Sequence, residues 1–171
     1  MTRHPLVVVM GASGCGKSTI GAQLASKLGV AFVDGDDLHS AQNVAKMAAG
    51  HALTDTDRWP WLARVGQTLH AARDSGLVVA CSALKRAYRD AILEQAPGTW
   101  FALLDVPRDV LVERLERRTD HFMPAALLDS QLSTLEPLAP DEPGASFDTA
   151  GDVGDVVQRV SLCVNTRNLT A

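Results

Sequence analysis

A glycine-rich segment near the beginning of the chain carries residue types that bind phosphate. It matches the nucleotide-binding pattern G-x-x-x-x-G-K-[ST] as Gly11-Ala12-Ser13-Gly14-Cys15-Gly16-Lys17-Ser18. Glycines let the backbone curl so that successive N–H groups face phosphate oxygens, and a following helix adds its positive N-terminal dipole. Lys17 can reach the β- and γ-phosphates, while the Ser18 hydroxyl can ligate Mg²⁺. We therefore predict ATP binding at residues 11–19, ending at Thr19, with Lys17 in a catalytic role.

A second candidate group is a pair of carboxylates that follows a short apolar run. The segment reads Phe32-Val33-Asp34-Gly35-Asp36-Asp37. Beside a phosphate loop, one carboxylate can support Mg²⁺ through water, and another can accept the proton of an attacking hydroxyl group. We assign Asp34, together with Ser18, to the metal, and Asp36 to the proton as the catalytic base. The alternative is a plain acidic turn, because Asp-Gly is a common turn pair.

Three arginines end a predicted helix in the second half of the chain. They are Arg114, Arg117 and Arg118, and Thr119-Asp120-His121-Phe122 follows them. In a P-loop kinase a mobile lid begins here, and a lid arginine can neutralise the transferring phosphate while closure excludes water. We expect a lid over residues 114–137, with Arg118 catalytic and Arg114 assisting at the nucleotide. The alternative is a solvated basic face, which a helix C-terminus also favours.

The elements that must position these groups follow from the hydrophobic pattern. Short apolar runs alternate with helical periodicity, which indicates a parallel sheet with helices on both faces. The expected strands cover residues 6–10, 30–33, 77–81, 100–104 and, weakly, 146–149. The expected helices cover residues 18–28, 40–49, 86–96, 109–118 and 124–135, with a further helix that has Pro60 in its first turn and another in the tail. The fold class is therefore α/β, a P-loop kinase fold of five parallel strands in one domain, residues 1–171, with ligands at the strands' carboxyl ends.

Other classes of P-loop protein fit the sequence less well. A GTPase needs Asp-x-x-Gly together with Asn-Lys-x-Asp, and only the first occurs, as Asp148-Thr149-Ala150-Gly151 near the end of the chain. A remodelling ATPase would place an acidic residue after the third apolar run, where this chain has Cys81-Ser82. A nucleotide-binding regulatory module without turnover is the alternative from another class, but Asp34, Asp36 and the lid arginines favour an enzyme.

The composition is ordinary for a soluble globular protein and restricts the partners. The 171 residues include 16 basic and 20 acidic ones, a net charge of −4, so nucleic acid is not an expected partner. No apolar run approaches the roughly 20 residues that span a bilayer, and residues 6–10 are too few for a signal-peptide core. We expect a cytoplasmic protein without membrane contact. Cys15, Cys81 and Cys163 are widely spaced, which favours reduced thiols, and Cys15 fits a small loop residue better than a reactive one.

In these motifs the chain resembles the gluconokinase family, relatives of shikimate kinase among the small P-loop kinases. The likeness covers nearly the whole chain and rests on Asp34-Gly35-Asp36, Leu38-His39, Asn43, Lys46-Met47, Gly50, Leu53, Asp55, Asp57-Arg58, Pro60-Trp61-Leu62, Cys81-Ser82-Ala83-Leu84-Lys85, Tyr88-Arg89-Asp90, His121-Phe122 and residues 131–136. The chain departs from the family at Ser40 and Ala52, where relatives often carry proline, and at Asp120, where glycine is common. The resemblance implies transfer of the ATP γ-phosphate to the 6-hydroxyl of D-gluconate, with Mg²⁺, by a homodimer.

The matching segments supply cations and polar side chains that suit an acid with a row of hydroxyl groups. The residues expected to bind the substrate are Asp36, His39, Asn43, Lys46, Arg58, Lys85, Arg89 and His121. Arg58, Lys85 and Arg89 provide charge for the carboxylate, and the polar side chains can bond hydroxyls. The nearest rival is a kinase of the same fold that acts on another small acid, such as shikimate.

Several of these residues have structural alternatives that the sequence leaves open. Arg58, beside Trp59, could stack on an aromatic ring rather than bind the acid. His39 could cap the helix that follows it. Asn43 and Lys46, three residues apart on one helical face, could be plain surface.

Overall fold

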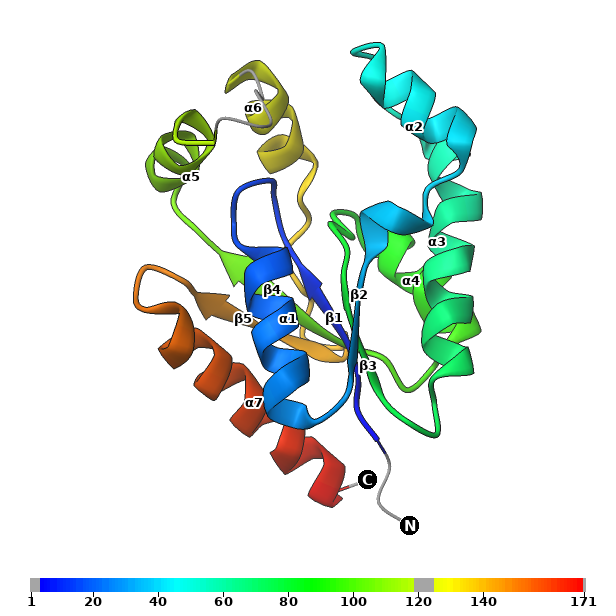
Figure 1. The fold of residues 1–171 in the computed structure, drawn as a ribbon, viewed down its shortest axis with the longest axis vertical. Coiled ribbons are helices and arrows are strands. Elements are labelled where there is room, and N and C mark those ends of the chain that lie inside the picture. The colour runs from blue at the N-terminus through cyan, green and yellow to red at the C-terminus, as the bar shows by residue number, and fades with distance from the viewer. Residues whose placement is uncertain (1–3, 119–124, 171) are drawn as a thin grey trace.

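The computed structural model describes residues 4–118 and 125–170 and confirms the predicted α/β class. Five parallel strands form one sheet in the order β2-β3-β1-β4-β5 (Figure 1). The strands are β1 (Leu6–Met10), β2 (Ala31–Asp34), β3 (Leu77–Ala80), β4 (Trp100–Asp105) and β5 (Gly144–Asp148). Each strand begins and ends close to its predicted range, because the short apolar runs that predicted them are the strands themselves.

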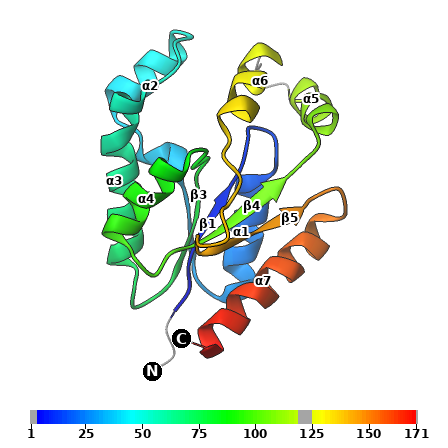
Figure 2. The ribbon, with the colours of Figure 1, turned by 180° about the vertical axis from the view of Figure 1, so that it is seen from behind.

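Helices cover both faces of this sheet. They are α1 (Lys17–Leu28), α2 (Ala41–Ala48), α3 (Asp55–Ala71), α4 (Arg86–Gln95), α5 (Arg108–Glu116), α6 (Ala125–Thr134) and α7 (Val153–Thr170), with a 3₁₀ helix, η1 (Gly35–Leu38). Helices α1 and α7 pack together on one face, and α3 packs with α4 on the other (Figures 1 and 2). The predicted arrangement of helices on both sides of a parallel sheet is therefore confirmed.

The core consists of two apolar layers, one on each face of the sheet. Successive side chains along a strand point to opposite faces. Val7 and Val9 of β1 pack into the layer under α1 and α7, whereas Val8 and Met10 pack into the layer under α3 and α4. All four side chains are fully buried, which explains why this strand has a continuous apolar sequence instead of an alternating one.

Helix α3 begins earlier than predicted. Its first residue is Asp55, so Pro60 lies in the second turn, and the prediction that Pro60 lies in the first turn is wrong. The Thr54 hydroxyl accepts the Asp57 backbone N–H at 3.2 Å, and the Asp57 carboxylate accepts the Thr54 N–H at 2.8 Å. This reciprocal capping box satisfies backbone donors at the helix start, which is why the helix starts there and tolerates the proline one turn later.

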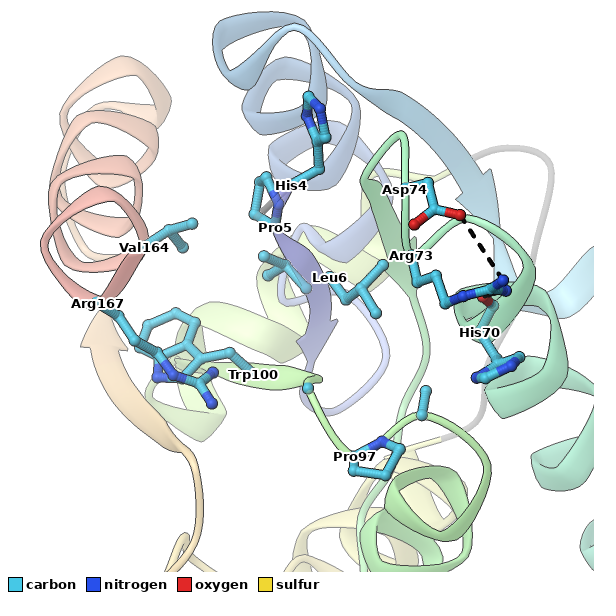
Figure 3. A pocket seen from close by; sticks show the side chains of 13 residues that line it. His4, Pro5, Leu6, His70, Arg73, Asp74, Pro97, Trp100, Val164 and Arg167 are labelled. Atoms are coloured by element: carbon cyan, nitrogen blue, oxygen red, sulfur yellow. Dashed lines mark hydrogen bonds and ion pairs between the residues drawn. The ribbon is translucent and has the colours of Figure 1, made fainter. Parts of the chain in front are cut away.

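The two edges of the sheet differ in character. Strands β1, β2 and β3 end at the edge that carries the loop before α1, η1 and the overhanging helices α5 and α6 (Figure 1). A hollow of about 460 Å³ lies at the opposite edge, where His4, His70, Trp100 and Val164 are among the residues that line it (Figure 3). Since it borders the beginnings of β1 and β4, this hollow is remote from the predicted site. Among the described helices, none is both long and apolar enough to cross a membrane.

Candidate active site

The loop between β1 and α1 has a conformation that its glycines allow. Gly11, Gly14 and Gly16 have positive φ angles of 144°, 82° and 96°, which residues with a Cβ atom rarely adopt. A Cβ atom on Gly11 would also lie 2.8 Å from the sulfur of Cys15. Cys15 itself is buried, which favours the predicted role of a small packed residue over that of a reactive thiol.

Lys17 is the first residue of α1, and its ammonium group turns back over the loop. Its Nζ atom donates to the carbonyl oxygens of Gly11 at 3.0 Å and Ala12 at 3.1 Å. The ammonium group is therefore held beside the loop N–H groups that would surround a phosphate. Thr19 is exposed in the same turn of α1. The loop, the helix start and Lys17 together present the donors and the positive charge that a phosphate group needs.

Ser18 and Asp34 connect the loop to the end of β2. The Ser18 hydroxyl donates to Asp34 Oδ2 at 2.8 Å, and Asp34 Oδ1 accepts the backbone N–H of Asp36 at 3.1 Å. The second bond caps η1, so it fixes the position of Asp36. Two hard oxygen ligands side by side fit Mg²⁺, which takes few protein ligands and completes its shell with phosphate and water.

Asp36 lies at the mouth of the site. Its side chain is 86% exposed, and its Oδ1 atom is 4.0 Å from Nε2 of His39. Partial removal of water by the surrounding protein raises the pKa of Asp36, and Asp34 raises it further, while Lys17 and His39 act in the opposite direction. Because solvent still reaches most of the side chain, we expect this rise to be small. Asp36 is thus an ionised carboxylate of increased basicity, which suits a proton acceptor.

His39 packs against α3 and does not cap α2. Its ring stacks on Trp61 with the ring centroids 4.1 Å apart, and only 4% of its side chain is exposed. The cap of α2 is Ser40, whose hydroxyl accepts the backbone N–H of Asn43 at 3.1 Å, so the alternative of His39 as a cap is wrong. Burial lowers the pKa of His39, although Asp36 raises it, and the ring is therefore neutral at pH 7.

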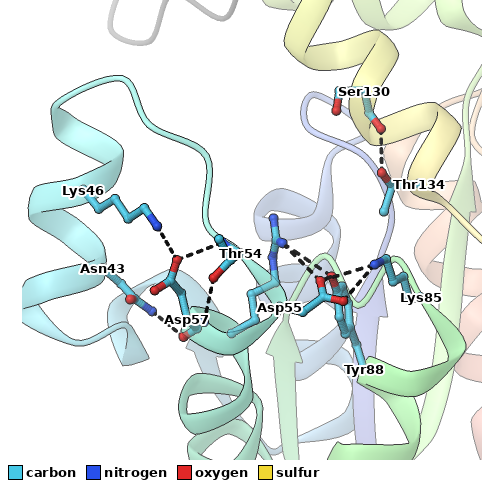
Figure 4. A network of polar contacts seen from close by, with 10 residues as sticks. Asn43, Lys46, Thr54, Asp55, Asp57, Lys85, Tyr88, Ser130 and Thr134 are labelled. Atoms are coloured by element: carbon cyan, nitrogen blue, oxygen red, sulfur yellow. Dashed lines mark hydrogen bonds and ion pairs between the residues drawn. The ribbon is translucent and has the colours of Figure 1, made fainter.

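Asn43 and Lys46 connect α2 to the beginning of α3 (Figure 4). Asn43 Nδ2 donates to the carbonyl oxygen of Asp57 at 3.0 Å, and Lys46 Nζ lies 2.5 Å from Asp57 Oδ2. Asn43 is only 5% exposed, so the alternative of plain surface is wrong for this residue. Both side chains position α2, and their direct contact with a substrate stays a prediction.

A charged and aromatic cluster joins the starts of α3 and α4 (Figure 4). Lys85 Nζ lies 3.2 and 3.0 Å from the two carboxylate oxygens of Asp55, and the Tyr88 hydroxyl donates to Asp55 at 2.5 Å. Arg58 lies 3.8 Å from Asp55 and 5.6 Å from the centre of the Tyr88 ring. Arg58 therefore lies over an aromatic ring, as its structural alternative predicted, and the ring is that of Tyr88. The structure brings Arg58 and Lys85, two predicted carboxylate ligands, to one place.

Asp55 and Tyr88 were given no role by the sequence analysis. The bonds from Tyr88 and Lys85 lower the pKa of Asp55, so it stays ionised and neutralises one of the two cations. The cluster then carries one net positive charge, which matches one carboxylate. Tyr88 lies three residues after Lys85, a spacing that could have indicated contact on a helix. The place of Asp55 depends on where α3 begins, which Pro60 obscured.

The prediction that Arg89 binds the substrate carboxylate is wrong. Its side chain is fully buried, and its guanidinium group pairs with the Glu142 carboxylate at 2.5 and 2.9 Å. Its Nη1 atom donates to the carbonyl oxygens of Ala83 and Leu84 at 3.0 and 3.2 Å. Because these donors are used inside the protein, Arg89 anchors the loop that carries Lys85 and does not face a ligand.

The predicted lid arginines occupy different positions around α5. Arg114, in the last turn of α5, donates to the carbonyl oxygen of Thr149 at 3.3 Å, which places it beside the loop after β5. Arg118 lies just beyond the end of α5 and is exposed. His121 lies outside the described residues, so its contact with a substrate stays a prediction.

The chain is similar to known kinases in sequence and in structure. A family model described as shikimate kinase matches residues 13–139. The thermosensitive gluconokinase of Escherichia coli (strain K12) is 40% identical over 161 residues, covering 92% of this chain and 86% of that protein. The gluconokinase of Gluconobacter oxydans (strain 621H) is 48% identical over 139 residues, covering 80% and 78%. The crystal structure of a gluconokinase from Sinorhizobium meliloti 1021 matches with a TM-score of 0.89 and 42% identity, covering 97% of this chain and 94% of that one.

Proposed function

This chain belongs to the gluconokinase family of small P-loop kinases, and from that membership we propose that it transfers the γ-phosphate of ATP to the 6-hydroxyl of D-gluconate, giving 6-phospho-D-gluconate. The order of charges along the site carries this proposal. Ser18 of the phosphate loop donates to Asp34 at 2.8 Å, Asp34 accepts the backbone N–H of Asp36, and the Asp36 carboxylate lies 4.0 Å from His39. His39 stacks on Trp61 of α3, the helix whose first turns carry Asp55 and Arg58 of the cationic cluster. Phosphate loop, proton acceptor and cationic cluster are therefore neighbours in that order, which suits an acid with its reacting hydroxyl at the far end.

The phosphate loop binds the nucleotide in this proposal. The backbone amides of residues 12–18 and the ammonium group of Lys17 hold the phosphates. Ser18 would ligate Mg²⁺, with Asp34 supporting it, and the ion would neutralise phosphate charge when bound. Arg118, assisted by Arg114, closes over the β- and γ-phosphates from the lid, residues 114–137.

Asp36 acts on the acceptor hydroxyl group. It orients that group toward the γ-phosphorus and takes its proton as the new O–P bond forms and the bond to the leaving ADP oxygen breaks. Phosphoryl transfer leaves little covalent work for the protein, so most of the rate comes from position and charge stabilisation. The neutral ring of His39 offers a hydrogen bond to a substrate hydroxyl beside Asp36.

The cationic cluster binds the other end of the substrate. Arg58 and Lys85 attract the carboxylate, and the Tyr88 hydroxyl is close enough to share in its recognition. Ionised Asp55 limits the cluster to one net positive charge, so a single carboxylate balances it.

The proposal also includes the organisation of the chain. One domain, residues 1–171, would carry the whole site, in a cytoplasmic protein that acts as a homodimer. Val44 and Met47 are exposed apolar side chains of α2, and a second copy of the chain could cover them.

A coupled assay of ADP release with Mg-ATP and a panel of sugar acids, including gluconate and shikimate, tests the function. We expect turnover with gluconate and none with shikimate. Lys85→Met should raise the KM for gluconate by roughly 10-fold to 100-fold, the scale of one hydrogen bond to a charged group, and leave the KM for ATP unchanged. Lys27→Met removes an exposed lysine from the last turn of α1 and is the matched control.

Each alternative outcome has a distinct meaning. Turnover with a different acid would keep the phosphate machinery and overturn the substrate. ATP binding without turnover on any acid would support the regulatory module instead. An unchanged KM for gluconate in Lys85→Met would remove the cluster from the carboxylate site.

A further inference from the structure

A side chain of helix α6 is hydrogen-bonded to the phosphate loop. The backbone N–H of Ser13 donates to Oε1 of Gln131 at 2.8 Å, between residues 118 positions apart in the sequence. The N–H groups of this loop are the donors that nucleotide phosphates use. In this conformation the carboxamide oxygen of Gln131 therefore accepts a hydrogen bond from an N–H group that could otherwise bind phosphate.

The packing around α6 holds Gln131 in that position. Leu128, one turn before Gln131, is fully buried in the same apolar cluster as Ala12 and Cys15 of the loop. The Gln131 side chain thus reaches the loop from a helix that shares a buried apolar cluster with it. The Ser13–Gln131 hydrogen bond and the apolar cluster both connect α6 to the phosphate loop.

The segment that follows α6 is hydrogen-bonded to the loop that carries Lys85, at the proposed carboxylate site. The carboxylate of Glu136 accepts the backbone N–H of Arg86 at 2.6 Å, and the Glu136 N–H donates to the carbonyl oxygen of Leu84 at 2.8 Å. These residues flank Lys85 of the cationic cluster. Helix α6 therefore contacts the phosphate loop through Gln131, and the segment directly after it is held beside the proposed carboxylate site through Glu136.

A carboxamide has an oxygen that accepts and an NH₂ group that donates. Resting on the proposed kinase function, we infer that Gln131 belongs to the binding site of the terminal phosphoryl group and makes the site distinguish ATP from ADP. The N–H groups at the helix start serve the inner phosphates and Lys17 reaches the β- and γ-phosphates, whereas Ser13 lies four residues before Lys17, where Gln131 of α6 contacts the loop. When ATP binds, an oxygen of the terminal phosphoryl group replaces Gln131 Oε1 as the acceptor of the Ser13 N–H. The released carboxamide then donates its NH₂ to a phosphoryl oxygen, and ADP leaves the Gln131–Ser13 bond intact.

Gln131→Glu tests this inference because it keeps the side-chain length and the accepting oxygen. It removes the NH₂ donor and adds a negative charge facing the phosphate. Calorimetric titration with Mg²⁺ and either an imido analogue of ATP or ADP should show roughly 10-fold or greater loss of affinity for the analogue. The affinity for ADP should change by less than about 3-fold. Gln67→Glu makes the same substitution at an exposed position of α3 and should change neither affinity.

A merely structural contact gives a different result. Either Gln131→Glu would change neither affinity, or it would lower the affinities for the ATP analogue and for ADP by the same factor. Each of these outcomes would overturn the inference. If thermal melting shows that Gln131→Glu is unfolded, Gln131→Ala replaces it, and the preference for the ATP analogue over ADP should then decrease. These titrations contain no sugar acid, so they remain decisive even if gluconate proves to be the wrong substrate.

Discussion

Asp36 has the two properties of a proton acceptor, and both come from its neighbours. Asp34 accepts the backbone N–H of Asp36. This hydrogen bond places the Asp36 carboxylate beside the loop that leads to Lys17. The surrounding protein and Asp34 together raise the pKa of Asp36, while solvent access limits the rise. The group is therefore ionised at neutral pH and more basic than an ordinary aspartate, so it can take a hydroxyl proton without first losing one.

Asp36→Asn removes the acceptor but keeps the size of the side chain. We expect kcat to fall by on the order of 100-fold, the usual scale for loss of a general base, with the KM for ATP nearly unchanged. Asp37→Asn, at the adjacent exposed carboxylate, should keep a kcat close to that of the wild type. Steady-state kinetics with gluconate measures both variants, and a nearly normal kcat in Asp36→Asn would exclude the base role.

At the scale of elements, the proposed substrate end of the site lies where α2 is attached to α3. Asp57 accepts from Thr54 as part of the capping box and also pairs with Lys46. These partners lower the pKa of Asp57 to about 2. A group with a lowered pKa in the folded protein contributes its stabilisation above its ordinary pKa and loses it only as the pH falls toward the lowered value. The attachment of α2 is therefore intact across the physiological pH range.

Asp57→Asn tests whether this attachment positions the acid site. The variant keeps a polar cap but loses the charge that holds Lys46. The KM for gluconate should rise by roughly 3-fold to 10-fold, the scale of a partly exposed ion pair with a weakened cap, while the KM for ATP stays constant. Asp74→Asn, at an exposed aspartate beyond the end of α3, is the control. An equal rise in both KM values would show a general loss of structure instead of a local one.

The elements were predictable where sequence neighbours are also neighbours in space. The strands and the phosphate loop follow from local apolar runs and glycines, and their predicted places are close to the observed ones. The contacts of Arg89 were not predictable, because its partner Glu142 lies 53 residues away and no local pattern separates a buried arginine from one in a binding site. The contact of Gln131 with the phosphate loop was hidden for the same reason. The start of α3 differs from the prediction because Pro60 favours the first turn of a helix, whereas the capping box of Thr54 and Asp57 starts this helix at Asp55.

At the scale of the whole molecule, a buried ion pair joins segments that are distant in sequence. Arg89 of α4 and Glu142, just before β5, have side chains that are 0% and 2% exposed. Arg89 lowers the pKa of Glu142. The pair thus contributes stability above the ordinary carboxyl pKa of 4.5, and this contribution is lost as the pH falls through the lower value of the folded state.

Arg89→Met breaks this pair and leaves a buried carboxylate without its partner. The free energy of unfolding at pH 7 should fall by about 3–5 kcal/mol, as measured by urea denaturation. Arg86→Met removes the exposed pair of Arg86 with Asp141 and should cost no more than about 1 kcal/mol. The double variant Arg89→Met/Glu142→Leu should lose less stability than the wild type as the pH falls from neutral to below the ordinary carboxyl pKa of 4.5. Equal acid sensitivity would show that the pair does not control the pH dependence.

The central strand β1 lies between β3 and β4, is fully buried from Val7 to Met10, and leads directly into the phosphate loop. The first end of the loop is therefore anchored at the centre of the sheet. By thermodynamic linkage, the free energy of nucleotide binding adds to the resistance of the entire sheet to unfolding. The proposed acid site at α2 and α3 lies away from the central strand, where segments can open locally. We therefore expect ATP to protect the backbone amides of the whole sheet from hydrogen exchange, and gluconate to protect chiefly those of α2 and the start of α3.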